Sequence, residues 1–254
     1  MLHIVSVATE SRYYLPYLQD TCRKFGSDLI VLGYGEKWTG YVFKFEKIIE
    51  FLRTIDPWDI VCFVDGYDVI CTRDLSMLIP TFYQIKRRTG CKIVIGEDGG
   101  YIPTFISKLY FGTCANQFIN SGTYIGIAGD ILGILLEARD LYPKERDDQI
   151  LLTKYCDMFP KRFYIDKHNE IFQSHIHPLT QARIMGSPFF VHAPGCGYLD
   201  NILGNMGYDV DPQIKLELRG YFFKKAGEHT MVLLRRYILW IILIIIIIII
   251  LTNA

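Results

Sequence analysis

Short apolar runs alternate with amphipathic stretches along most of the chain. The apolar runs, each expected to form a strand, lie at residues 2–8, 28–33, 60–65, 92–96, 123–128 and 188–192. Between the first three runs, residues 13–25 and 43–52 repeat apolar side chains every three or four positions, which is the period of a helix. This alternation predicts an α/β domain whose mostly parallel sheet is flanked by helices.

The stretch 43–52 carries the clearest helical pattern. Phe45, Ile48, Ile49 and Leu52 are spaced i, i+3, i+4 and i+7, and charged residues occupy the other positions. Such a stripe is typical of a helix that lies on a hydrophobic core. We therefore expect this helix to cover one face of the sheet.

A different pattern ends the chain. Residues 237–251 are uncharged and almost entirely branched aliphatic, and Arg235 and Arg236 precede them. This run predicts a C-terminal membrane anchor, but such a helix reaches only ~22 Å of a ~30 Å hydrocarbon core, so that spanning requires bilayer thinning or snorkelling arginines. Because the arginines come first, we expect the N-terminal domain on the cytosolic side of the membrane.

No repeat, Gly/Ser linker or low-complexity block interrupts the chain before the C-terminal isoleucines. We expect one domain over residues 1–210, a basic connector over 211–236 and the anchor over 237–251. The chain has 254 residues and 50% hydrophobic content, enough for a domain with a sizeable core. Its 27 basic and 27 acidic residues balance, so the charge gives no indication of nucleic-acid binding.

The seven cysteines are scattered and show no C-x-x-C spacing. This distribution argues against a zinc site and against a disulfide scaffold. It favours a reducing compartment, in which the thiols stay free.

Candidate chemistry begins where the third apolar run ends. Asp65 and Asp68 follow the run directly in Asp-Gly-Tyr-Asp, and ligands of open α/β sheets bind beyond the strand ends. Two carboxylates there suit Mg²⁺ or Mn²⁺, which usually join protein acids to the phosphates of a substrate. The alternative is an ordinary Asp-Gly turn with solvated acids.

Polar residues also follow other predicted strands. His192 ends the last apolar run and could complete a metal shell, or it could be purely structural. Asn120 precedes another strand, and Asp147 and Asp148 open a helical stretch, where a single acid would serve as an N-cap. Trp38 lies in a glycine-rich loop and offers a flat face to a nucleobase.

Together these motifs resemble a known family. Their order is Val-Ala-Thr, Leu-Gly-x-Gly-Glu-x-Trp-x-Gly, Phe-x-Asp-x-x-Asp-Val-Ile, Asn-Ser-Gly-x-x-Ile-Gly, Asp-Asp-Gln, Ile-Phe-Gln, Val-His and Leu-Gly-Asn. From about Leu2 to Tyr208 the chain resembles the glycosyltransferase module of the procollagen lysyl hydroxylases. The resemblance implies a GT-A (Rossmann-like) fold and a UDP-sugar donor carrying galactose or glucose. It implies hydroxylysine or galactosyl-hydroxylysine of collagen-like protein as the acceptor.

The resemblance also assigns roles to residues. It implies Mn²⁺, with Mg²⁺ as the alternative, held by Asp65, Asp68 and His192. Asp147 and Asp148 match the acidic helix of the family, which faces the sugar and the acceptor. The expected donor contacts are Val7, Thr9, Trp38, Lys44, Tyr67, Asn120 and Gly195. The chain departs from the family after His192, where Ala-Pro-Gly replaces Gly-Asn-Gly and removes a donor contact.

Several readings of the chemistry stay open at this stage. In an inverting transfer, Asp147 or Asp148 would take the proton of the acceptor hydroxyl. In a retaining transfer, the same acids would stabilise positive charge on the sugar ring. A phosphohydrolase is disfavoured because Asp65-x-x-Asp68 has one residue more than the usual Asp-x-Asp. The remaining alternative is an inactive, membrane-tethered module that binds UDP-sugar or collagen.

Overall fold

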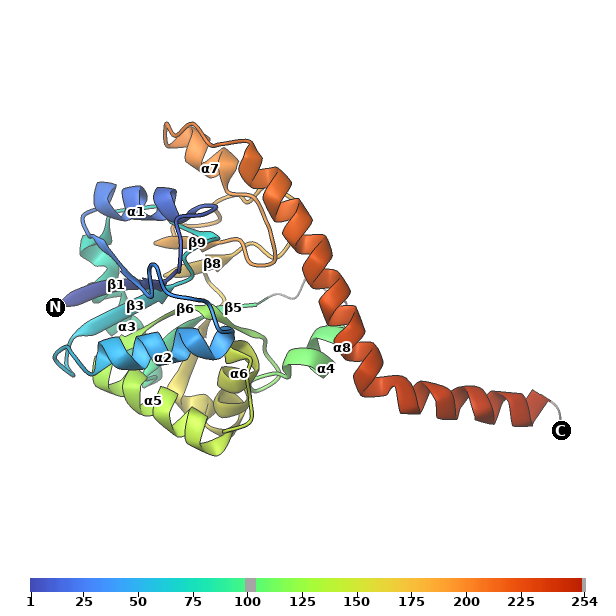
Figure 1. Ribbon diagram of the computed structural model, residues 1–254. Helices are drawn as coiled ribbons and strands as arrows, with labels where there is room; N and C mark the ends of the chain where they lie inside the picture. The colour runs from blue at the N-terminus through green and yellow to red at the C-terminus, as the bar shows by residue number, and fades with distance from the viewer. Residues whose placement is uncertain (99–103, 253–254) are drawn as a thin grey trace.

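A six-stranded sheet lies at the centre of the computed structural model, which describes residues 1–98 and 104–252 (Figure 1). Its strand order is β2-β1-β3-β6-β5-β7. The strands are β1 (Leu2–Val7), β2 (Leu29–Leu32), β3 (Ile60–Val64), β5 (Ile93–Glu97), β6 (Ile119–Ile127) and β7 (Phe163–Asp166). Only β6 runs antiparallel to its neighbours β3 and β5, while the other neighbouring pairs are parallel. The predicted α/β class and mostly parallel sheet are confirmed.

A second, smaller sheet stands beside the first. It contains β4 (Val69–Cys71), β9 (Phe190–His192) and β8 (Phe172–Ser174), in the order β4-β9-β8. Strand β4 follows β3 after only four residues, and β9 pairs with it antiparallel, so that Val69 lies opposite His192. Residues about 120 positions apart in the chain therefore meet at one place.

Helices cover both faces of the large sheet (Figure 1). On one face, α2 (Tyr41–Leu52), α5 (Ala128–Leu141) and α6 (Asp148–Met158) share a hydrophobic cluster with β1, β3 and β6. On the other, α1 (Leu15–Lys24) and α3 (Leu78–Thr89) share a cluster with both sheets. The predicted stripe on α2 is buried, as Phe45, Ile48, Ile49 and Leu52 are each at most 4% exposed. The remaining helical elements are η1 (Leu75–Met77), α4 (Thr104–Phe111), η2 (Pro160–Arg162), α7 (Asp200–Asn205) and α8 (Gln213–Thr252).

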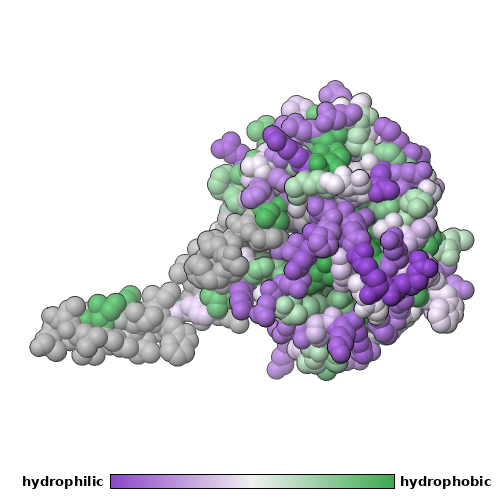
Figure 2. All heavy atoms as spheres, turned by 180° about the vertical axis from the view of Figure 1, so that it is seen from behind, coloured by the Kyte–Doolittle hydropathy of each residue, from purple (hydrophilic) through white to green (hydrophobic). Residues whose placement is uncertain are grey.

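Helix α8 begins on the body of the domain and then extends away from it (Figure 1). The green atoms on its outer part in Figure 2 are hydrophobic. On its outer part Ile238, Ile242, Ile245 and Ile248 are about half exposed. In the part of the chain that the structure describes, no helix combines the length and hydropathy needed to cross a bilayer. The predicted membrane span is therefore not supported. The domain boundaries and the cytosolic location stay predictions.

One prediction about the cysteines was wrong. Cys114 and Cys156 form a disulfide, while the other five cysteines are free and buried. Cys114 lies at the base of a two-residue turn that leads into β6, and Cys156 lies in the last turn of α6. The two cysteines are 42 positions apart in the chain, and only the packing of α6 against the sheet brings their thiols together, so the sequence did not reveal the pairing.

The disulfide should contribute measurably to stability. Replacing both Cys114 and Cys156 by Ser is expected to lower the free energy of unfolding by about 2–4 kcal/mol, because the unfolded chain loses a cross-link that closes a long loop. Urea unfolding of both proteins, with and without dithiothreitol, measures the effect. The reductant should destabilise the wild-type chain and leave the double variant unchanged. Equal stability of the two proteins without reductant would contradict the expectation.

Candidate active site

The centre of the candidate site is the turn between β3 and β4, residues 65–68, here called the metal loop. Asp65 and Asp68 stand at its two ends, and His192 ends the neighbouring strand β9. One ligand atom from each of these three residues lies within 4.8 Å of the others. His192 Nε2 is 3.2 Å from Asp68 Oδ1 and 3.9 Å from Asp65 Oδ2. The structure thus brings together the three residues predicted as metal ligands.

The surroundings of His192 fit a cation. The imidazole is 1% exposed, and neither ring nitrogen makes a well-aligned hydrogen bond within the described chain, although Nε2 lies 3.2 Å from Asp68 Oδ1 as an ion pair. Burial by itself would lower the pKa of His192, but the carboxylates of Asp68 and Asp65 outweigh it and raise the pKa. A buried polar group without a partner is destabilising. A metal ion bound between the two aspartates would satisfy the open imidazole nitrogen.

Gly122 provides the space in which these three side chains converge. A Cβ atom at this position would lie 2.8 Å from Asn120 Oδ1 and closer still to Asp65 and His192. Gly122 lies on β6 beside the metal loop, because the Gly122 carbonyl accepts a hydrogen bond from the amide of Asp65 at 2.7 Å. Asn120 Oδ1 in turn accepts from the amide of Gly122 at 2.7 Å. Only a glycine leaves room for the carboxylate and the imidazole together.

A buried lysine connects the metal loop to the acidic helix. Lys44, in the first turn of α2, places its Nζ 2.9 Å from Asp65 Oδ1 and 2.6 Å from Asp148 Oδ2. Ser121 Oγ also donates to Asp148 Oδ2, at 2.9 Å. Burial lowers the pKa of Lys44, but the two carboxylates outweigh burial and raise it. Lys44 therefore stays charged, and its ammonium group compensates both Asp65 of the metal loop and Asp148 of α6.

The two acids of α6 have different surroundings. Asp148 is buried and holds Lys44, whereas Asp147 is the N-cap, whose Oδ1 accepts from the amides of Gln149 and Ile150. Burial, followed by the charge of Asp148, raises the pKa of Asp147 to about 6, despite the amide hydrogen bonds that lower it. A carboxyl with such a pKa can exchange a proton near neutral pH. The N-cap role weighed from the sequence is thus present, together with a perturbed acid.

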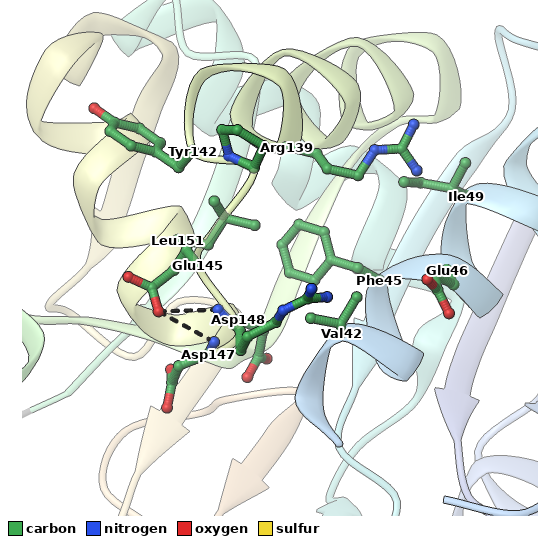
Figure 3. Close-up of a pocket in the computed structure, with 12 residues that line it drawn as sticks. Val42, Phe45, Glu46, Ile49, Arg139, Tyr142, Glu145, Asp147, Asp148 and Leu151 are labelled. Atoms are coloured by element: carbon green, nitrogen blue, oxygen red, sulfur yellow. Dashed lines mark hydrogen bonds between the residues drawn. The ribbon is translucent and has the colours of Figure 1, made fainter. Parts of the chain in front are cut away.

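A pocket opens beside the acidic pair (Figure 3). It lies between α2, the end of α5 and the start of α6, and Phe45, Arg139 and both aspartates line it. Figure 3 shows the carboxylate of Glu145 accepting from the two backbone amides that precede α6. These bonds fix the turn that presents Asp147. The pocket thus borders the turn that carries this acid.

The loop between β1 and α1, residues 8–14, lies against the metal loop. The Tyr67 hydroxyl accepts from the amides of Thr9 at 3.1 Å and Glu10 at 3.3 Å. The carbonyl of Thr9 accepts from the amide of Gly35, in the glycine-rich loop, at 2.9 Å. Thr9 and Tyr67, both expected as donor contacts, therefore lie close together, and the carbonyl of Val7 is 3.4 Å from where a Cβ on Gly66 of the metal loop would stand. Because β1, β2 and β3 are parallel, the three loops that follow them lie at one edge of the sheet.

The other predicted donor contacts surround the same region. Trp38 is 42% exposed, and its ring packs edge-on against Tyr41 and Phe43 at the start of α2. Asn120 lies on β6 beside Gly122. Gly195 has φ +69° in the turn after β9, a conformation that favours glycine. Their contacts with a donor stay predictions.

Two residues of the site carried no assigned role in the sequence. Ser121 and Gly122 follow Asn120 directly, within the Asn-Ser-Gly motif. Because side chains alternate along a strand, Ser121 points to the face of α6 while Asn120 and Gly122 point to the metal loop. The strand predicted from the sequence begins at residue 123, whereas β6 begins at Ile119. A predicted strand that included residues 119–122 would have indicated, from the alternation of side chains, which face each of these residues occupies.

Gly122 allows a direct test of the metal site. Gly122→Ala is expected to weaken Mn²⁺ binding roughly 10–100-fold, because the new methyl group displaces Asp65 and His192 from a common centre. Titration of Mn²⁺ into the full chain, followed by electron paramagnetic resonance of the free ion, measures the affinity. The matched control is Gly133→Ala on α5, where a Cβ meets no atom within 4 Å. Unchanged Mn²⁺ affinity in Gly122→Ala would rule out this site.

Comparison with solved structures supports the fold. A glycosyltransferase involved in the glycosylation of the major capsid of PBCV-1 superposes with a TM-score of 0.54 at 12% sequence identity. The match covers 82% of this chain and 99% of that one. At this identity the likeness concerns the fold alone, which is an α/β fold of the GT-A type.

Sequence comparison identifies relatives. A multifunctional procollagen lysine hydroxylase and glycosyltransferase of Caenorhabditis elegans is 26% identical in an alignment 275 residues long that covers 93% of this chain and 36% of that protein. A procollagen-lysine,2-oxoglutarate 5-dioxygenase of Drosophila melanogaster is 26% identical over 238 residues, which cover 80% of this chain and 32% of that protein. The chain thus spans about a third of the length of these relatives. The family described as the PLOD GT domain matches residues 1–184, well over half of the chain, and the chain therefore belongs to this glycosyltransferase family.

Proposed function

We propose that this chain transfers a hexose, galactose or glucose, from a UDP-sugar to hydroxylysine or galactosyl-hydroxylysine of a collagen-like protein. The observation that carries the proposal is the convergence of Asp65, Asp68 and His192 within 4.8 Å. In a member of this glycosyltransferase family, a cation centre next to the β1–α1 loop suits a nucleotide diphosphate. The sugar and the acceptor are inferred from the family, whose C. elegans member is named for both hydroxylase and glycosyltransferase activities.

The donor set favours Mn²⁺, with Mg²⁺ as the alternative. Two carboxylates suit either ion, and the imidazole of His192 adds a nitrogen ligand that Mg²⁺ seldom takes. When bound, such a cation would offset the negative charge that develops on the departing diphosphate. Lys44, which contacts Asp65, would add a fixed positive charge beside the same phosphates.

The remaining residues would bind and orient the donor. The exposed face of Trp38 suits stacking on uracil. Thr9 and Tyr67, joined by the hydrogen bond from the Thr9 amide to the Tyr67 hydroxyl, would enclose the base and the ribose together with Val7. Asn120 and Gly195 would border the diphosphate and the sugar. Fixing the donor in this way supplies much of the rate enhancement, because orientation removes an entropic barrier.

The acidic pair would share the chemistry unequally. Asp148 compensates Lys44 and would keep that cation aimed at the donor. Asp147 uses Oδ1 to cap α6 and stands at the edge of the pocket next to it. In an inverting transfer Asp147 would take the proton of the acceptor hydroxyl. In a retaining transfer it would stabilise the positive charge on the sugar.

Loss of a metal ligand should abolish turnover. The full chain is expected to hydrolyse or transfer from a UDP-hexose only with Mn²⁺ present, and Asp65→Ala should reduce the rate roughly 100- to 1000-fold, since electrostatic stabilisation of the leaving group is lost. Release of UDP, measured with and without EDTA, tests this expectation. Asp20→Ala, on the surface of α1, serves as the control. If the wild-type chain binds UDP and Mn²⁺ but turns over no UDP-hexose, the chain is a binding module instead.

The donor and acceptor need their own assay. UDP-galactose, UDP-glucose, UDP-xylose and the N-acetylated UDP-hexoses are offered with a hydroxylysine peptide and with its galactosylated form. We expect product only with UDP-galactose or UDP-glucose, detected by a mass increase of one hexose on hydroxylysine. Equal yield on a peptide with lysine in place of hydroxylysine would refute the proposed acceptor.

Asp147 predicts a pH dependence. As a base it must be deprotonated, so kcat/KM should rise with pH through about 6, the value to which burial and Asp148 raise its pKa. Because the charge of Asp148 raises this pKa, Asp148→Asn should move the inflection to lower pH. A pH profile of kcat/KM measures both. An inflection that persists unchanged in Asp147→Asn would exclude Asp147 as its origin.

A further inference from the structure

The start of α8 is built into the domain at the edge of the candidate site. Ile214 and Leu218 are 8% and 4% exposed, and both belong to a cluster with Tyr14 and Leu199. Lys215 forms an ion pair at 2.7 Å with Asp200, at the start of α7. These contacts fix residues 213–223 against the body, although the family match ends at residue 184.

Two polar side chains of this segment reach loops of the candidate site. Glu217 Oε2 lies 3.6 Å from Arg12 Nε, in the β1–α1 loop. Tyr221 forms a side-chain hydrogen bond with Tyr41, the first residue of α2 and a ring neighbour of Trp38. One helix therefore touches both sides of the space proposed for the nucleotide.

From Arg12, contacts continue to the metal loop. The Arg12 guanidinium lies 4.4 Å from the centre of the Tyr13 ring, and that ring packs edge-on against Tyr67, with centres 5.9 Å apart. Tyr67 stands between Asp65 and Asp68 in the chain. Contacts of cation on ring and ring on ring each contribute modestly and depend on geometry. Movement of Arg12 would therefore reach the loop that carries both aspartates.

The backbone of the β1–α1 loop depends on these contacts. Tyr13 has φ +50°, which non-glycine residues rarely adopt. The amides of Thr9 and Glu10 donate to the Tyr67 hydroxyl, and the amide of Tyr14 donates to the Tyr67 carbonyl at 3.3 Å. A loop in this conformation persists only when its surroundings hold it. Residue Glu217 of α8 supplies the outermost of these restraints.

We propose that the first turns of α8, residues 213–223, act as a clasp that fixes the β1–α1 loop and the metal loop for the donor, with Glu217 and Arg12 as positioning residues. The inference rests on the proposed function for its ligand, a uridine diphosphate with a divalent cation. Neither residue touches the reacting atoms. Their effect passes through Tyr13 and Tyr67.

Charge reversal on the full chain tests the clasp without any ligand. Glu217→Arg and Arg12→Glu each place like charges together, and each should speed hydrogen exchange at the amides of Thr9 and Glu10 roughly two- to fivefold, the range expected for one exposed ion pair. The combined Arg12→Glu, Glu217→Arg chain restores opposite charges between the loop and α8 but still lacks the 3.4 Å ion pair of Arg12 with Glu10, so exchange should return part of the way to the wild-type rate. Recovery of the exchange rate in the double variant would show that the single reversals act through the ion pair and not through general damage to the fold.

The matched control is a second exposed ion pair. Arg23 and Asp20 on α1 lie 3.1 Å apart and are 68% and 56% exposed. Asp20→Arg should leave exchange at Thr9 and Glu10 unchanged. An equal effect in this control, no effect of the single reversals, or no recovery in the double variant would each overturn the clasp.

Nucleotide affinity then tests its consequence. Calorimetric titration of UDP with Mn²⁺ should show Kd raised by the same factor in the single reversals and partly restored in the double variant. Faster exchange with an unchanged Kd would overturn the assigned role in donor binding. A wild-type chain that binds no UDP would refute the proposed function, while the exchange rates would still decide whether the clasp exists.

Discussion

The candidate site depends on two antiparallel pairings that meet at the metal loop. Strand β3 pairs with β6, which sets Asp65 against Gly122, and β4 pairs with β9, which sets Val69 opposite His192. A slip of one residue in either register would turn a side chain to the opposite face of its sheet. The four residues between β3 and β4 are thus held from both ends. Two sheets position three ligands that the chain supplies far apart.

Charge balance is the second constraint on this region. Asp65 and Asp148 approach the same ammonium of Lys44, which is buried in α2. Each of these charges in isolation would be destabilising in the interior, and the pairing makes their burial tolerable. The pairing also joins the metal loop to α2 and α6, which begin shortly after Trp38 and directly after Asp147. The proposed donor and acceptor sides are therefore linked by one cation.

Local patterns in the sequence predicted some residues of the site and not others. Asp65 was placed correctly at the end of a buried strand, because five consecutive apolar residues followed by Asp-Gly are typical of a parallel strand. The stripe on α2 predicted its buried face in the same way. Lys44 is expected as a donor contact from the resemblance alone, and nothing in the sequence indicates its two carboxylate partners, Asp65 and Asp148. Gly122 was quoted within a motif without a role, since the need for space appears only when three side chains converge.

The sequence by itself determined the strand and helix periods, the α/β class and the acids at the strand end, because these follow from local alternation of apolar and polar residues. The tertiary structure alone decided the Cys114–Cys156 bond, the antiparallel direction of β6, and the contact of Glu217 with Arg12. Each of these joins segments separated by tens to hundreds of positions. Pattern along a chain reports on neighbours within a few residues, whereas such pairs form only when packing and loop closure bring distant segments together.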